Sequence, residues 1–130
     1  MRVLIADDSK LVRRSVAALL SSQLNWEICG EAADGAEALG EARKLLPDLI
    51  LLDIRMPGMN GLETARLLRQ AVPAAKIIVM SQYDPARLLP YVIEAGAHGC
   101  VDKNCLATDL LGVVKAAGAE PGARQARGAP

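Results

Sequence analysis

Three carboxylates, one hydroxyl and one ammonium group stand just after the short apolar runs of this sequence. Taken one at a time, an aspartate at such a place is most simply a helix cap, a serine a turn residue and a lysine a surface charge. Three carboxylates gathered at one place differ, because their repulsion must raise at least one pKa or be offset by a cation. The residues are Asp7 and Asp8 after run 3–6, Asp53 after 49–52, Ser81 after 77–80 and Lys103 after 97–101.

These side-chain types suit phosphoryl transfer assisted by a divalent metal ion. Carboxylates without paired His or Cys ligands favour a hard cation, Mg²⁺, or Mn²⁺ in its place. The metal and Lys103 would neutralise charge on a transferring phosphoryl group, while Ser81 would supply a neutral donor. A carboxylate nucleophile would then give an aspartyl phosphate.

The pattern of apolar residues predicts how the chain brings this set together. Runs 3–6, 49–52 and 77–80 are apolar throughout, as strands buried on both faces of a parallel sheet are. Residues 26–29 alternate like an edge strand, and 97–101 are a weaker fifth candidate. Five strands alternating with five helices predict an α/β fold, a doubly wound five-stranded parallel sheet in three layers. Ligands of such sheets bind beyond the carboxyl ends of the strands, where the polar residues stand.

Four of the five predicted helices have clear apolar stripes, and the fourth contains a proline. Asp34 and Asn60 precede the second and third helices as N-cap residues, and Pro85 begins the fourth. Pro90 falls inside the fourth helix, where it removes a backbone donor. We therefore expect that helix to be short, kinked or restarted at Pro90. The four stripes are Val12, Val16, Leu19 and Leu20; Ala38, Ala42, Leu45 and Leu46; Leu62, Ala65, Leu68 and Val72; and Leu106, Leu110, Val113 and Val114.

Composition limits the class of protein. A length of 130 residues predicts one domain, over 1–117, and we expect 118–130 to be a flexible tail or linker stub. Fifteen basic residues balance fifteen acidic ones, so charge gives no reason to expect nucleic-acid or membrane binding. Three cysteines without metal-ligand spacing predict reduced thiols and a cytoplasmic protein, and no apolar run reaches membrane-spanning length.

Two other phosphate chemistries do not fit the sequence. It contains neither a G-x-x-x-x-G-K-[ST] loop nor a G-x-G-x-x-G motif after the first strand. A haloacid-dehalogenase-type phosphatase would carry a D-x-D pattern there, whereas Asp7 and Asp8 are adjacent.

The chain resembles bacterial response-regulator receiver domains of two-component systems over residues 1–116, in particular those of LuxR-type (NarL/FixJ-like) transcription regulators. The resemblance implies a flavodoxin-like sheet with strand order 2-1-3-4-5 and a signalling protein rather than a conventional enzyme. Its partner would be a sensor histidine kinase, it would form a homodimer on phosphorylation, and it would contact DNA only through an effector domain absent from this chain. The matching segments are 3–8, 51–63, Ser81, 94–97 and Lys103, with 53–63 the most distinctive.

The resemblance also implies a role for each site residue. Asp53 would accept the phosphoryl group from a kinase phosphohistidine. Asp8 and Asp53 would bind Mg²⁺ directly, together with the backbone carbonyl of Arg55, and Asp7 would act mainly through water. Ser81 would swing toward the phosphate on activation. The groups expected to hold phosphoryl oxygens are those of Ser81 and Lys103.

The chain departs from the family pattern at several positions. Cys100 stands where a Tyr or Phe is usual, and a small thiol cannot give the usual ring rotation. Pro90 lies on a helix face that family members commonly use for partner binding. Arg55 and Tyr83 occupy positions that tune phosphoryl lifetime, and we hypothesise that their length excludes water and prolongs the phosphorylated state. These departures leave a second interpretation, a phosphate-independent interaction module with the same fold.

Overall fold

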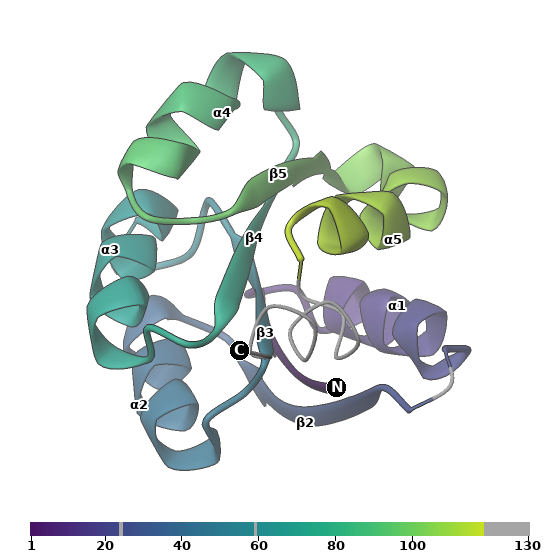
Figure 1. Ribbon diagram of the computed structural model, residues 1–130, viewed down its shortest axis with the longest axis horizontal. Coiled ribbons are helices and arrows are strands. Elements are labelled where there is room, and N and C mark those ends of the chain that lie inside the picture. Colours follow the sequence, from purple (N-terminus) through teal and green to yellow (C-terminus); the bar gives the residue numbers. More distant parts are fainter. Residues whose placement is uncertain (24, 59, 119–130) are drawn as a thin grey trace, which may run out of the picture.

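The computed structural model describes residues 1–23, 25–58 and 60–118, which form a three-layer α/β fold (Figure 1). The strands are β1 (Arg2–Ala6), β2 (Glu27–Ala32), β3 (Leu49–Asp53), β4 (Lys76–Ser81) and β5 (Gly99–Asp102). The helices are α1 (Lys10–Ser21), α2 (Gly35–Leu45), α3 (Gly61–Ala71), α4 (Pro85–Glu94) and α5 (Leu106–Ala116), and the 3₁₀ turn η1 (Lys103–Cys105) precedes α5.

The five strands form one parallel sheet in the order β2-β1-β3-β4-β5. Helices α1 and α5 cover one face of this sheet, and α2, α3 and α4 cover the other (Figure 1). The predicted doubly wound topology and strand order are therefore confirmed, with the alternating strand at residues 26–29 at one edge. All five carboxyl strand ends lie along one rim, as a parallel sheet requires.

The central strands divide their side chains between two apolar cores. In β1, Leu4 contacts the core under α2, α3 and α4, while Val3 and Ile5 contact the core under α1 and α5. Every residue of β3 is buried. Burying one such aliphatic side chain contributes about 1.5–3 kcal/mol, so the two cores fix the sheet that holds the rim.

The predicted helix caps are present. Asp34 accepts a hydrogen bond from the Glu37 N–H at 2.8 Å, and Asn60 accepts one from the Glu63 N–H at 2.8 Å. Each bond satisfies a donor at the start of a helix that lacks an intrahelical partner.

The fourth helix is continuous through Pro90, so the expected restart is absent, but it is shorter than each of the other four helices, as expected of the first alternative. Helix α4 runs for ten residues, beginning with Asp84 as N-cap and Pro85 at its first turn. Pro90 and Ala86 are both exposed, so water can solvate the Ala86 carbonyl that loses its helical donor. Val92, fully buried beyond the proline, anchors the second half of the helix.

One residue of the predicted apolar stripes is exposed to solvent. Leu46 is 66% exposed and ends α2 in the left-handed conformation, with φ of 49°. The cause is Pro47, because a proline disfavours the helical conformation in the residue before it. The stripe of α2 therefore ends at Leu45.

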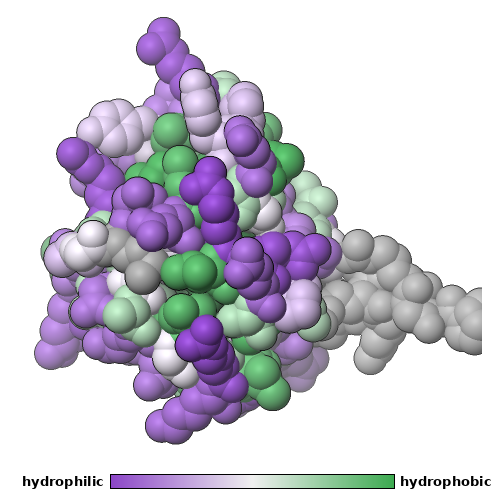
Figure 2. All heavy atoms as spheres, turned by 90° about the vertical axis from the view of Figure 1, so that its left-hand side faces the viewer, coloured by the Kyte–Doolittle hydropathy of each residue, from purple (hydrophilic) through white to green (hydrophobic). Residues whose placement is uncertain are grey.

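The side formed by α2, α3 and α4 has a mostly hydrophilic surface with apolar side chains showing in its middle (Figure 2). Helix α4 exposes the large apolar side chains of Leu89, Tyr91 and Ile93. In the part of the chain that the structure describes, no helix is long and apolar enough to span a membrane. Of the predicted tail 118–130, residues 119–130 lie outside the described residues.

Candidate functional site

The rim at the carboxyl ends of the strands carries a cluster of three carboxylates. Asp7 and Asp8 directly follow β1, and Asp53 is the last residue of β3. One oxygen from each of the three lies within 4.8 Å of the others. Asp7 is fully buried and Asp53 is 3% exposed, whereas Asp8 is exposed to solvent. The predicted convergence of these acids is therefore present in the structure.

Lys103 joins two of the carboxylates. Its Nζ lies 2.7 Å from Asp7 Oδ2 and 3.3 Å from Asp53 Oδ2, and its side chain is 11% exposed. Lys103 is the first residue of the turn η1, directly after β5. From this position at the carboxyl end of the sheet, its side chain reaches Asp7 and Asp53. One ammonium among three carboxylates leaves this group with an excess of two negative charges.

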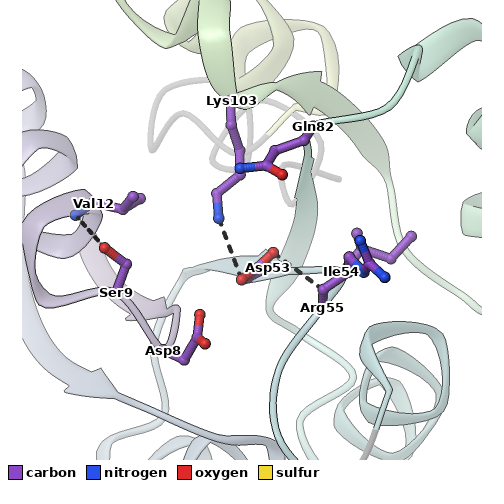
Figure 3. A pocket seen from close by; sticks show the side chains of 8 residues that line it. All are labelled: Asp8, Ser9, Val12, Asp53, Ile54, Arg55, Gln82 and Lys103. Atoms are coloured by element: carbon purple, nitrogen blue, oxygen red, sulfur yellow. Dashed lines mark hydrogen bonds and ion pairs between the residues drawn. The ribbon is translucent and has the colours of Figure 1, made fainter.

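Next to the cluster lies a hollow of about 300 Å³. Asp8, Asp53 and Lys103 reach the same space from the ends of three different strands (Figure 3). The backbone also contributes, because the Arg55 N–H donates a hydrogen bond of 3.1 Å to Asp53 Oδ1. The lining residues are Asp8, Ser9, Val12, Asp53, Ile54, Arg55, Gln82 and Lys103.

Burial and neighbouring charges shift the pKa values at the site. Burial is the largest cause that raises the pKa of Asp53, and the Asp7 charge adds to it, while the Arg55 N–H and Lys103 oppose the rise. Burial lowers the pKa of Lys103, but its hydrogen bond to Asp7 and the charge of Asp53 outweigh that effect and raise it. Lys103 is therefore firmly cationic at neutral pH, and Asp53 is more basic than an ordinary aspartate.

Ser81 ends β4 at the same rim but faces inward. It is fully buried, and its Oγ accepts a hydrogen bond of 2.9 Å from the Tyr83 N–H. Its neighbour Gln82, which the sequence analysis did not select, lines the hollow instead.

Arg55 and Tyr83 are joined to each other beside the hollow. The Arg55 Nη1 donates a hydrogen bond of 2.7 Å to the Tyr83 hydroxyl. The guanidinium carbon also lies 5.4 Å from the centre of the Tyr83 ring, within the range of a cation–π contact. This pair links the loop after β3 to the loop after β4.

Cys100 lies outside the acidic hollow. Its side chain is buried in β5 and lines a separate groove of about 390 Å³ together with Pro85 and Gly112. Burial, with a smaller effect from the Asp102 charge, raises the pKa of the Cys100 thiol to about 11. The thiol is therefore neutral and behaves as a small core residue.

Two residues that the sequence analysis did not select support Asp7. The Ser9 N–H donates a hydrogen bond of 2.8 Å to Asp7 Oδ1, and the Arg13 Nη1 donates one of 2.7 Å to the Asp7 carbonyl. Ser9 also caps α1, because its Oγ accepts from the Val12 N–H at 3.2 Å. A serine just before a helical stripe is a recognisable cap signal. Nothing in the spacing of Arg13 marked its contact with Asp7.

The fold and the site together define a class of protein with a flavodoxin-like sheet that carries an acidic cluster and a lysine at its rim. The chain matches the family described as Response regulator receiver domain over residues 3–115. It belongs to that family, whose members are non-enzymatic phosphoacceptor modules.

Individual relatives agree with this assignment. The chain is 39% identical to the transcriptional regulatory protein LiaR of Bacillus subtilis over 118 residues, covering 90% of this chain and 56% of LiaR. A two-component response regulator of the LuxR family from Aurantimonas sp. SI85-9A1 superposes with a TM-score of 0.82 at 30% identity, covering 88% of this chain and 82% of the other. A complex of CheX and CheY with BeF3 and Mg²⁺ from Borrelia burgdorferi gives a TM-score of 0.81 at 27% identity, covering 88% and 86%.

These relatives confirm the resemblance to receivers of LuxR-type regulators. The chain spans about half the length of curated relatives such as LiaR.

Proposed function

We propose that this chain is a phosphorylation switch in which Asp53 accepts a phosphoryl group from the phosphohistidine of a sensor histidine kinase. The observation that carries the proposal is the contact of one lysine with two buried carboxylates beside an acidic hollow. A merely structural rim would have no reason to concentrate negative charge in this way. The signal would pass to an effector outside this chain, in transcription control, which is the role of relatives such as LiaR.

The site fits a magnesium ion. Its ligand atoms are oxygens, and the excess negative charge of the cluster calls for a hard cation. Asp8, Asp53 and the backbone carbonyl of Arg55 would bind Mg²⁺, and Asp7 would act through water. Bound Mg²⁺, or Mn²⁺ in its place, would neutralise charge on phosphoryl oxygens. The similar CheY complex from Borrelia burgdorferi, which contains BeF3 and Mg²⁺, supports this proposal.

The transfer step follows from the positions of Asp53 and Lys103. An Asp53 carboxylate oxygen attacks phosphorus, the bond from phosphorus to the donor nitrogen breaks, and the donor imidazole leaves with that electron pair. The Lys103 ammonium, 3.3 Å from Asp53 Oδ2, stands where negative charge develops on the phosphoryl oxygens. The product is an acyl phosphate on Asp53.

Ser81 would convert phosphorylation into a conformational change. To donate its hydroxyl to a phosphoryl oxygen on Asp53, Ser81 would turn its side chain toward Asp53, and we expect that turn to break its bond with the Tyr83 N–H. That turn releases the backbone of Tyr83 and thereby the loop that leads into α4. Because α4 exposes apolar side chains, a change in its position would alter a surface suited to a homodimer or another partner.

Arg55 and Tyr83 would set how long the phosphoryl group persists. Arg55 lines the hollow that contains Asp53, and its hydrogen bond to the Tyr83 hydroxyl joins the two long side chains at that side of the site. The joined side chains would reduce the access of water to the acyl phosphate and slow its hydrolysis.

The experiment that tests the proposed function is intact-mass analysis after incubation with acetyl phosphate, with and without Mg²⁺. The wild-type chain should gain one phosphoryl group only with Mg²⁺, and Asp53→Asn should gain none. Asp109→Asn removes an exposed carboxylate from α5 and should behave as wild type. Size-exclusion elution of the same samples reports any homodimer. No adduct from acetyl phosphate, beryllofluoride or a panel of kinases would make this chain a phosphate-independent interaction module.

A further inference from the structure

We propose that Arg13 is a positioning residue for the metal site, because it fixes the peptide that joins Asp7 to Asp8. This inference rests on the proposed function, since it concerns the Mg²⁺ site described above. Arg13 itself lines no part of the hollow. It acts through the backbone on the two adjacent acids.

The contacts of Arg13 tie three elements together. Arg13 is the fourth residue of α1, and its Nη1 donates to the Asp7 carbonyl at 2.7 Å. Its Nε donates to Glu31 Oε1 on β2 at 2.9 Å. The Arg13 side chain is only 16% exposed, and its bond to the Asp7 carbonyl is partly buried, whereas the bond to Glu31 lies at the surface. Two bonds from one planar guanidinium fix its orientation, and with it the direction of the donor toward Asp7.

The Asp7 carbonyl depends on this donor because β1 has ended. The last residue of β1, Ala6, pairs with Leu52 on β3 and Ala32 on β2. Asp7 still donates its own N–H to the Ala32 carbonyl at 2.9 Å, but its carbonyl lies beyond the register of the strands. The guanidinium of Arg13 supplies that carbonyl with the hydrogen-bond donor that a neighbouring strand supplies to residues within β1.

Holding this carbonyl also holds both acids. A peptide unit is planar, so fixing the Asp7 carbonyl fixes the plane that ends at the Cα of Asp8. The Asp7 side chain is already held at Oδ1 by the Ser9 N–H and at Oδ2 by Lys103. Among the described residues the exposed Asp8 side chain has no such buried partner, so its placement depends most on the backbone that Arg13 holds.

The sign of the effect on Mg²⁺ binding separates positioning from simple electrostatics. A cationic Arg13 near the cluster repels Mg²⁺, so electrostatics alone predicts tighter binding when that charge is removed. Loss of positioning predicts weaker binding. Removing a residue that orients metal ligands typically costs about 10–100-fold in metal affinity.

The test is calorimetric titration of the full chain with Mg²⁺ alone. Arg13→Gln should bind Mg²⁺ at least about tenfold more weakly than wild type. Arg13→Lys keeps the charge but lacks the planar fork, and its affinity should fall between the two. Arg14→Gln makes the same charge change at the exposed neighbouring position and should bind as wild type.

A second readout needs no metal. The Asp8 amide belongs to the peptide whose carbonyl Arg13 holds, so its ¹H–¹⁵N resonance should shift in Arg13→Gln and stay in place in Arg14→Gln. If Arg13→Gln does not fold, as judged by circular dichroism, Arg13→Lys supplies both measurements. Equal or tighter Mg²⁺ binding by the Arg13 variant, with an unmoved Asp8 resonance, overturns the inference. If wild type binds no Mg²⁺, the metal site of the proposed function fails instead.

Discussion

Replacing Lys103 with methionine should destabilise the fold, and Mg²⁺ should reduce the difference from wild type. Lys103 Nζ lies 2.7 Å from Oδ2 of the fully buried Asp7, and methionine keeps the volume while removing the charge. Removing one partner of a buried ion pair costs about 3–5 kcal/mol, because the other charge stays buried. We expect a loss at the lower end of this range, about 3 kcal/mol, because Asp53, the other carboxylate that loses Lys103, keeps its hydrogen bond from the Arg55 N–H.

The assay is urea unfolding followed by circular dichroism, first without Mg²⁺. With a slope of about 2 kcal/mol/M, Lys103→Met should lower the midpoint by about 1.5 M. Lys115→Met, on the exposed side of α5, should change stability by less than about 0.5 kcal/mol. Asp7→Asn/Lys103→Met removes both partners and should recover much of the loss.

Added Mg²⁺ should reduce the difference in stability between Lys103→Met and wild type. The ammonium and the metal neutralise the same carboxylates, so Mg²⁺ should bind more tightly to Lys103→Met than to wild type. Each tenfold gain in affinity recovers about 1.4 kcal/mol of the difference. A variant as stable as wild type without Mg²⁺, or a loss that Mg²⁺ leaves unchanged, would refute the electrostatic reasoning.

Three further predictions concern the loops and helices around the site. Arg55→Ala/Tyr83→Ala should lose its phosphoryl group severalfold faster, measured by intact mass over time; an unchanged rate contradicts the water-exclusion hypothesis. Cys100, with a pKa of about 11, is about 0.1% thiolate near pH 8, so iodoacetamide should label it last among the cysteines, at a rate that rises up to pH 11. Fast labelling of the folded chain would contradict this. Pro90→Ala should stabilise α4 by up to about 3 kcal/mol in urea unfolding, and a loss of stability would show that the proline is needed there.

Much of the fold was predictable because its signals are local. Run 49–52 is apolar at every position, and the structure buries all of β3 as the central strand of a parallel sheet. Asp34 and Asn60 marked helix starts through short-range cap bonds. The spacing of apolar residues predicted Leu46 on the buried stripe of α2. Pro47 instead ends the helix there, because proline disfavours the helical conformation in the residue before it. Whether the fourth helix would restart at Pro90 could not be decided from the sequence, because tolerance of a lost helical hydrogen bond depends on solvent exposure, which the sequence does not display.

The sequence predicted where the site lies, but not which side chains contact one another there. Topology brings strand ends together, so Asp7, Asp53 and Lys103 converge once the strand order is known. Side-chain partners depend instead on distances and rotamers across elements far apart in sequence. The bond from Arg55 to Tyr83 and the bond from Arg13 to Asp7 are of this kind, and only the three-dimensional structure reveals them.

The decisive test of phosphorylation at Asp53 is to map the modified residue after phosphorylation in Mg²⁺. Borohydride reduces an acyl phosphate to an alcohol, so a phosphorylated aspartate becomes homoserine, which peptide mass spectrometry can locate. We expect homoserine at position 53 alone, dependent on Mg²⁺ and on the phosphoryl donor. Homoserine at position 7 or 8, or at none of the three acids in a chain that has gained a phosphoryl group, would contradict it.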